Sequence, residues 1–278
     1  MTFARKLQST TQKFPVIFFS PGMNWTSLDY SYLIQELVSR GNILIGINPE
    51  ALSTLFYDPS IPALKKSMSL DERVVQTTHS IKTAASFTLK NLAAMGLRNA
   101  DIEKVAFLGH SLGGASSLLA AMDFPGLKAA INLDGDLLES SKEAQPACPI
   151  LFICQFPDED FSSSSPMLEA LKGENWRYEN MSRASRKVSN AYFIGMNGLA
   201  HSDFLDAALI PRTMIPPGIA SDKFGRLNPQ LALDLVAKNI LLFLKASFDK
   251  DFGVFETKIQ KGLKQRIFNL KTGILISQ

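Results

Sequence analysis

The chain has 278 residues, of which 46% are hydrophobic and 20% charged, so it can bury a sizeable core and is not a wholly disordered protein. Its formal net charge is +3, and no basic stretch is interleaved with aromatic residues, which argues against nucleic acid as a partner. The two cysteines and three histidines are scattered without the spacing of a zinc site.

No run of about 20 apolar residues is present to span a membrane, and residues 1–13 lack the apolar core of a secretory signal. Cys148 and Cys154 are too far apart along one predicted strand to form a disulfide, so both are expected to be thiols in the core. These features make a cytoplasmic location the default expectation.

Short apolar runs alternate with helical patterns along the chain. The apolar runs predict buried strands in six segments: residues 15–22, 42–50, 104–111, 129–136, 148–160 and 190–204. Apolar residues at helical spacing predict helices in the segments between and after them: residues 27–41, 72–95, 112–122 and 229–248. Continuous apolar strands that alternate with helices indicate a parallel sheet covered by helices on both faces.

Two further segments allow more than one interpretation. Residues 206–227 form a long proline-bearing connection, which is either a flap near a site or an ordinary surface loop. Residues 249–278 form a basic tail in which apolar residues recur at helical spacing. This pattern fits an amphipathic helix on an anionic membrane or a terminal helix packed on the preceding domain. The apolar residues in question are Phe252, Phe255, Ile259, Leu263 and Ile267.

The stretch "FLGHSLGGASS" at residues 107–117 contains the pattern G-x-S-x-G, centred on Ser111. This pattern places a serine on a sharp turn between a strand and a helix, with glycines where larger side chains would clash. A predicted strand ends at Ser111 and a predicted helix follows it, so Ser111 is the candidate nucleophile. The N-terminus of that helix favours developing negative charge.

A serine hydroxyl needs a general base, and the base needs an acid to orient it. His201 follows the last predicted strand in the loop "NGLAHSDF", at the edge of the sheet where ligands bind in open α/β folds. It is therefore the candidate base. His110 is expected to point away from the nucleophile and to pack, and His79 to be solvated on its helix.

The candidate acid lies at the end of one of two strands. Asp134 and Asp136 follow the first strand after the elbow helix, and Asp158 and Asp160 follow the next one. Asp134 directly follows an apolar run, which favours an oriented, half-buried carboxylate, whereas Asp158 lies in a charged cluster. Position alone leaves both strand ends open.

An oxyanion hole requires two backbone N–H donors. The first donor is expected from Leu112, the residue after the nucleophile, and the second from Met23, in the turn after the first strand.

The chain resembles plasma-type platelet-activating factor acetylhydrolases, within the α/β-hydrolase superfamily, over roughly residues 14–248. The resemblance is carried, in chain order, by "FPVIFFSPGMNWTSLDYSYLIQELVSRGNILIGIN", "DIEKVAFLGHSLGGASS", "AAINLDGDL", "GLAHSDF" and "LALDLVAKNILLFLKASF". It implies the α/β-hydrolase fold, a mostly parallel sheet with helices on both faces. It also implies that Asp134 is the acid and that Met23 and Leu112 supply the oxyanion donors.

The chain departs from this family at several points. Pro21 and Gly22 stand where the family commonly has His-Gly, and Leu112 stands where it usually has Phe. Because only a dozen residues precede the first strand, the edge strands upstream of it are expected to be short or missing.

The expected function is that of a serine esterase, with a catalytic domain at residues 1–248 and the triad Ser111, Asp134 and His201. Neither a metal nor an organic cofactor is expected. The expected substrate is a small ester or a lipid with a short or medium acyl chain, including phospholipid sn-2 esters. The alternatives are a broad carboxylesterase or polyester hydrolase and, in another class, a binding protein that keeps the fold without catalysis.

Overall fold

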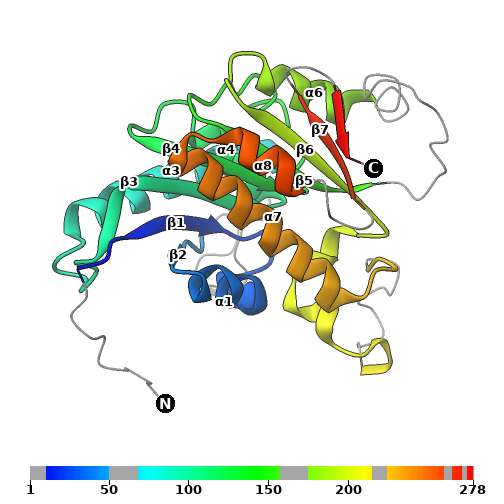
Figure 1. The fold of residues 1–278 in the computed structure, drawn as a ribbon, viewed down its shortest axis with the longest axis horizontal. Coiled ribbons are helices and arrows are strands. Elements are labelled where there is room, and N and C mark those ends of the chain that lie inside the picture. The colour runs from blue at the N-terminus through cyan, green and yellow to red at the C-terminus, as the bar shows by residue number, and fades with distance from the viewer. Residues whose placement is uncertain are drawn as a thin grey trace.

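The architecture is a single sheet between two layers of helices (Figure 1). It is seen in a computed structural model that describes residues 11–49, 68–156, 175–214, 224–259, 265–270 and 274–277. The sheet order is β2-β1-β3-β4-β5-β6-β7-β8. The strands are β1 Phe14–Ser20, β2 Ile43–Gly46, β3 Ala100–His110, β4 Leu127–Leu133, β5 Ile150–Phe156, β6 Ala191–Asn197, β7 Gln265–Asn269 and β8 Ile274–Ser277.

Strands β1 to β6 run parallel, and their carboxyl ends therefore meet at one edge of the sheet. Strands β1, β4, β5 and β6 and the second half of β3 are mostly buried, because helices cover both faces, which explains their continuous apolar sequences; the edge strand β2 is only partly buried. The predicted parallel sheet with helices on both faces is confirmed. In the described part of the chain, β2 is the outermost strand on its side.

The helices divide between the two faces of the sheet. The helices are α1 Ser31–Ser39, α3 Leu70–Asn91, α4 Leu112–Ala120, α6 Asn175–Ser185, α7 Pro229–Asp249 and α8 Phe252–Ile259. Buried side chains of α1, α7 and α8 form one core, and those of α3, α4 and α6 form the other. Figure 1 shows α7 crossing the first of these faces. Among the described residues, no helix has the length and hydropathy to cross a membrane.

The predicted helix starts are confirmed by their caps. The Ser69 hydroxyl accepts a hydrogen bond from the Glu72 N–H, and the Glu72 carboxylate accepts one from the Ser69 N–H, which closes the capping box of α3. The Asn228 side chain accepts from the Leu231 N–H at the start of α7, with Pro229 in its first turn.

The tail is not one helix: the expected packing of a terminal helix on the domain holds for α8, but the helical pattern does not continue to Ile267. Helix α8 ends at Ile259, and Ile267 lies on β7, opposite Ile194 of β6 in an antiparallel pairing. Strand β8 then pairs with β7. Phe255, Ile259 and Ile267 are fully buried in the domain core and are not available to a bilayer. Leu263 lies outside the described residues.

Packing of α8 on the sheet is predicted to be important for stability. Phe255 is 1% exposed, and its ring centroid lies 4.8 Å from that of Tyr192 and 5.7 Å from that of Phe243. Truncation of Phe255 to Ala should therefore lower the free energy of unfolding by about 3–5 kcal/mol in urea denaturation. The matched control is Val254→Ala, whose side chain is exposed. Equal effects of the two changes would contradict this packing.

Candidate active site

Ser111 occupies a sharp turn between β3 and α4. Its φ of 54° and ψ of −127° are unusual for a residue with a side chain, and its N–H donates to the Leu133 carbonyl of β4 at 2.8 Å. The flanking glycines make this turn feasible. A Cβ on Gly109 would lie 2.2 Å from the Gly113 carbonyl oxygen, and one on Gly113 would lie 2.2 Å from the Pro21 carbonyl oxygen. The sequence around Ser111 therefore folds as the predicted nucleophile elbow.

His201 begins the short helix η3 (His201–Phe204) that follows β6, at the same edge of the sheet as Ser111. Its Nε2 atom lies 3.0 Å from the Ser111 hydroxyl oxygen, and its Nδ1 atom lies 2.6 Å from a carboxylate oxygen of Asp134. With its proton on Nδ1, the ring donates to Asp134 and presents Nε2 as the acceptor for the serine hydroxyl. Three residues from distant parts of the chain thus form one hydrogen-bonded relay.

Asp134 is held by the backbone at the end of β4. Its side chain is fully buried, whereas that of His201 is 45% exposed. Its Oδ1 atom accepts a hydrogen bond from the Gln155 N–H at 3.0 Å, which leaves Oδ2 facing His201. Of the two described carboxylates at this strand end, Asp134 and Asp136, it is Asp134 that receives the histidine N–H. Asp158 and Asp160 lie outside the described residues.

The turn after β1 lies directly against the elbow. A Cβ on Gly22 would be 3.1 Å from the Ser111 Cβ, so the backbone at Met23 begins beside the serine. Leu112 is the first residue of α4, where backbone N–H groups have no partner within the helix. In the part of the chain that the structure describes, neither the Met23 N–H nor the Leu112 N–H donates a hydrogen bond to the protein. Both remain candidates for oxyanion donors.

Packing alone is the role predicted for His110, but its ring also lies within hydrogen-bonding distance of two groups. It is 1% exposed, and its Nδ1 lies 2.8 Å from the Tyr30 hydroxyl and its Nε2 lies 3.0 Å from the His201 carbonyl oxygen. Burial lowers the pKa of His110 to about 3, and the charge of the neighbouring His201 acts in the same direction. His110 is therefore neutral at physiological pH and does not replace His201 as the base. His79 is exposed on α3.

Two aspartates fix the loop that carries His201. One carboxylate oxygen of Asp203 accepts hydrogen bonds from the N–H groups of Ala200 and Gly225, both at 2.8 Å. The carboxylate of Asp206 accepts from the first N–H groups of α1, at Ser31 and Tyr32. The sequence predicted neither residue. Asp203 binds backbone groups in an unpredicted turn and at distant Gly225, and Asp206 binds backbone groups more than 170 positions away.

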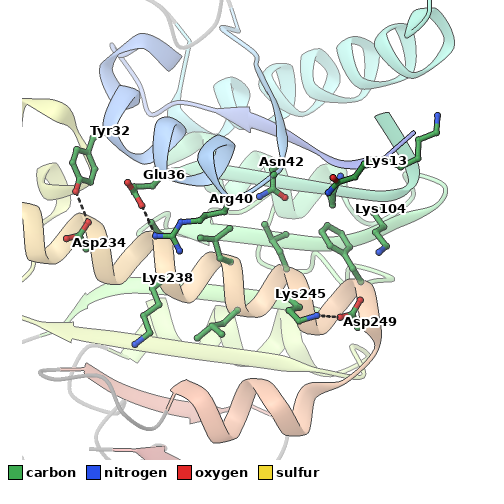
Figure 2. A pocket seen from close by; sticks show the side chains of 18 of the residues that line it. Lys13, Tyr32, Glu36, Arg40, Asn42, Lys104, Asp234, Lys238, Lys245 and Asp249 are labelled. Carbon is green, nitrogen blue, oxygen red and sulfur yellow. Dashed lines mark hydrogen bonds and ion pairs between the residues drawn. The ribbon is translucent and has the colours of Figure 1, made fainter. Parts of the chain in front are cut away.

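A groove of about 890 Å³ between α1 and α7 is separate from this site. Figure 2 shows Tyr32 of α1 reaching Asp234 of α7 across it, and Arg40, which follows α1, pairing with Glu36. Lys13 and Lys104 line it at the amino ends of β1 and β3, whereas Ser111 and His201 lie beyond the carboxyl ends. None of the candidate triad residues lines this groove.

The strand order, the elbow and the meeting of Ser111, Asp134 and His201 at one sheet edge define an α/β-hydrolase fold. The same fold is found among solved structures. A ferulic acid esterase from Streptomyces cinnamoneus matches this chain with a TM-score of 0.60 and 22% sequence identity, and the match covers 86% of this chain and 67% of the esterase chain. The chain belongs to the family described as platelet-activating factor acetylhydrolase, isoform II, whose model matches residues 85–266.

Two curated relatives are also similar to parts of this chain. The chain is 24% identical to the platelet-activating factor acetylhydrolase of Cavia porcellus over 282 aligned residues, which cover 87% of this chain and 60% of the relative. It is 27% identical to the cutinase est1 of Thermobifida alba over 117 residues, which cover 42% of this chain and 33% of that protein. The chain thus spans less than two thirds of the length of either relative.

The elbow is predicted to tolerate no side chain at Gly109. Because a Cβ there would meet backbone atoms, which cannot rotate away, Gly109→Ala should lower the free energy of unfolding by about 3 kcal/mol or more. The matched control is Gly253→Ala in α8, where the nearest atom to a Cβ is 3.6 Å away, and where alanine should leave stability equal or slightly higher. Thermal denaturation of both variants checks this, and a wild-type melting temperature for Gly109→Ala would refute the close approach.

Proposed function

We propose that this protein is a serine esterase that hydrolyses carboxylic esters through an acyl-enzyme. The observation that carries the proposal is the relay from the Ser111 hydroxyl through His201 to Asp134, with separations of 3.0 and 2.6 Å. A serine hydroxyl is a weak nucleophile unless a base is within hydrogen-bonding distance, and His201 Nε2 meets that requirement.

The two half-reactions follow from this geometry. The Ser111 oxygen attacks the ester carbonyl as His201 Nε2 takes its proton, and the N–H groups of Met23 and Leu112 bind the oxyanion. His201 then gives the proton to the departing alcohol, which leaves the acyl group on Ser111. Water attacks the acyl-enzyme with the same base, and Ser111 regains its proton as the acid is released. Buried Asp134 stabilises the charged imidazole throughout.

The proposed substrates are esters of short or medium acyl chains, among them phospholipid sn-2 esters. Membership of the acetylhydrolase family supports a short acyl group. Similarity to a cutinase and to a ferulic acid esterase supports a second candidate, a broad carboxylesterase or polyester hydrolase. These steps use only protein groups and water, so the proposed mechanism requires no metal or organic cofactor.

Labelling with a fluorophosphonate is expected to modify wild-type protein and to fail with Ser111→Ala, because the probe reacts with an activated serine. A series of p-nitrophenyl esters measured on the same samples should give the highest kcat/KM for acetyl or butyryl groups. A preference for long acyl chains would redirect the proposal to a lipase. A folded wild-type protein that neither reacts with the probe nor cleaves esters would instead indicate a binding protein.

Replacement of Asp134 by Asn is expected to lower kcat by a factor on the order of 10⁴, because the histidine would be held in the wrong tautomer. Asp158→Asn, at the other strand end considered from the sequence, should leave kcat within about threefold, because Asp134 already accepts the N–H of His201 in the proposed relay. Steady-state kinetics at pH 7.5 distinguish the two. A large loss in Asp158→Asn with an active Asp134→Asn would transfer the role to Asp158.

A further inference from the structure

One hydrogen-bonded chain joins the oxyanion turn to the loop of His201 through side chains that take no part in the triad. The Gly22 N–H lies 3.0 Å from the Tyr30 hydroxyl oxygen, and this oxygen lies 2.8 Å from His110 Nδ1. On the other side of the ring, His110 Nε2 lies 3.0 Å from the His201 carbonyl oxygen. Both Tyr30 and His110 are about fully buried, so water does not substitute for these contacts.

The chemistry of each group fixes the direction of every bond. The His201 carbonyl only accepts, so His110 must carry its proton on Nε2, and its Nδ1 must then be an acceptor. Tyr30 therefore donates to Nδ1 and uses an oxygen lone pair to accept from the Gly22 N–H. Each donor from the Gly22 N–H to His110 Nε2 therefore meets an acceptor. If any one of these hydrogen bonds were reversed, two donors or two acceptors would face each other.

We propose that Tyr30 and His110 are positioning residues that hold the oxyanion turn and the His201 loop in register on either side of Ser111. This inference rests on the proposed esterase function. Neither residue hydrogen-bonds to a side chain of the triad: Tyr30 holds the residue before the proposed Met23 donor, and His110 holds the backbone of His201. The positions of the base and of one oxyanion donor therefore depend on the same buried bond, between Tyr30 and His110.

Packing around the two rings limits their alternatives. The Tyr30 ring lies edge-on to Phe19 of β1, with centroids 4.8 Å apart. The His110 ring lies 4.6 Å from the ring of His201 and 5.1 Å from that of Phe204. Because His110 stays neutral, it places no positive charge beside the imidazole of His201. The hydrogen bonds through Tyr30 and His110 thus align His201, and His110 does not compete with it for a proton.

The first test is Tyr30→Phe, which removes the hydroxyl and keeps the ring. Loss of one oxyanion-hole donor costs about 10²–10³ in kcat, so misplacement of the turn that carries it should cost about tenfold to a hundredfold. KM for the best p-nitrophenyl ester should change by less than about threefold, because ground-state binding does not use this donor. Affinity for an alkyl boronic acid, which mimics the tetrahedral intermediate, should fall by about the same factor as kcat.

The matched control is Tyr192→Phe. This tyrosine is equally buried and its hydroxyl donates to Glu256 at 2.9 Å, between β6 and α8, far along the chain from the elbow. It should lower the melting temperature while leaving kcat and boronic acid affinity near wild-type values. If Tyr30→Phe behaves like Tyr192→Phe, the hydroxyl of Tyr30 has only a structural role and the proposal is wrong.

Substitutions of His110 can break its hydrogen bond to Tyr30 and its hydrogen bond to His201 one at a time. The amide nitrogen of Gln matches Nε2 and keeps the bond to His201, whereas the amide oxygen of Asn matches Nδ1 and keeps the bond to Tyr30. His110→Gln breaks the same bond as Tyr30→Phe. The double variant Tyr30→Phe/His110→Gln should therefore lose no more kcat than the worse of its two single variants. The double variant Tyr30→Phe/His110→Asn should lose more kcat than either of its single variants, because the two changes break different bonds. Additive losses for Tyr30→Phe with His110→Gln would overturn the coupling.

The outcomes separate this inference from the function beneath it. An active wild-type enzyme that loses fluorophosphonate labelling in Ser111→Ala, together with an unimpaired Tyr30→Phe, overturns the inference alone. A folded wild-type protein with neither labelling nor esterase activity overturns both.

Discussion

Around Ser111, backbone segments lie so close together that no side chain fits between them. The geometry of the site depends on this close approach. A Cβ on Gly113 would collide with the turn after β1, and a Cβ on Gly135 would lie 2.2 Å from the Ser111 carbonyl oxygen. The elbow therefore contacts the turn after β1 on one side and the end of β4 on the other. These are the segments that supply Met23 and Asp134. Close packing of glycine backbone thus brings Ser111, the end of β4 that carries Asp134 and the turn that carries Met23 together.

The two ends of the relay built on this contact differ in their exposure to solvent. Asp134 is fully buried and receives a backbone N–H from Gln155, so its charge is stabilised without water. The side chain of His201, by contrast, is nearly half exposed. The hydrogen bonds of Asp203 to Ala200 and Gly225 fix the loop that holds this imidazole beside the carboxylate.

Much of the fold and of the site was predictable because the signals are local. A buried strand, a glycine-flanked serine and an apolar helix follow one another directly, which identifies Ser111, and His201 follows the last parallel strand. Position alone left the acid open between Asp134 and Asp158, and the family resemblance favoured Asp134, whose carboxylate lies 2.6 Å from His201 Nδ1 in the structure. Tyr30 was not predictable at all, because its partner His110 lies 80 positions away and a buried tyrosine has no sequence signature. The tail was misjudged because Phe252 and Phe255 do lie on a helix, and nothing local separates Ile267 from them.

The pairing of β7 with β6 has a consequence for how the molecule is made. Strand β6 leads directly into the loop of His201, and one of its edges is covered by a strand some 70 positions later in the chain. During synthesis from the ribosome, the apolar edge of β6 stays uncovered until residues 265–269 emerge, and uncovered edges of this kind recruit strands of other chains. This edge of the sheet therefore depends on residues 265–269, which are translated well after β6, for protection against aggregation.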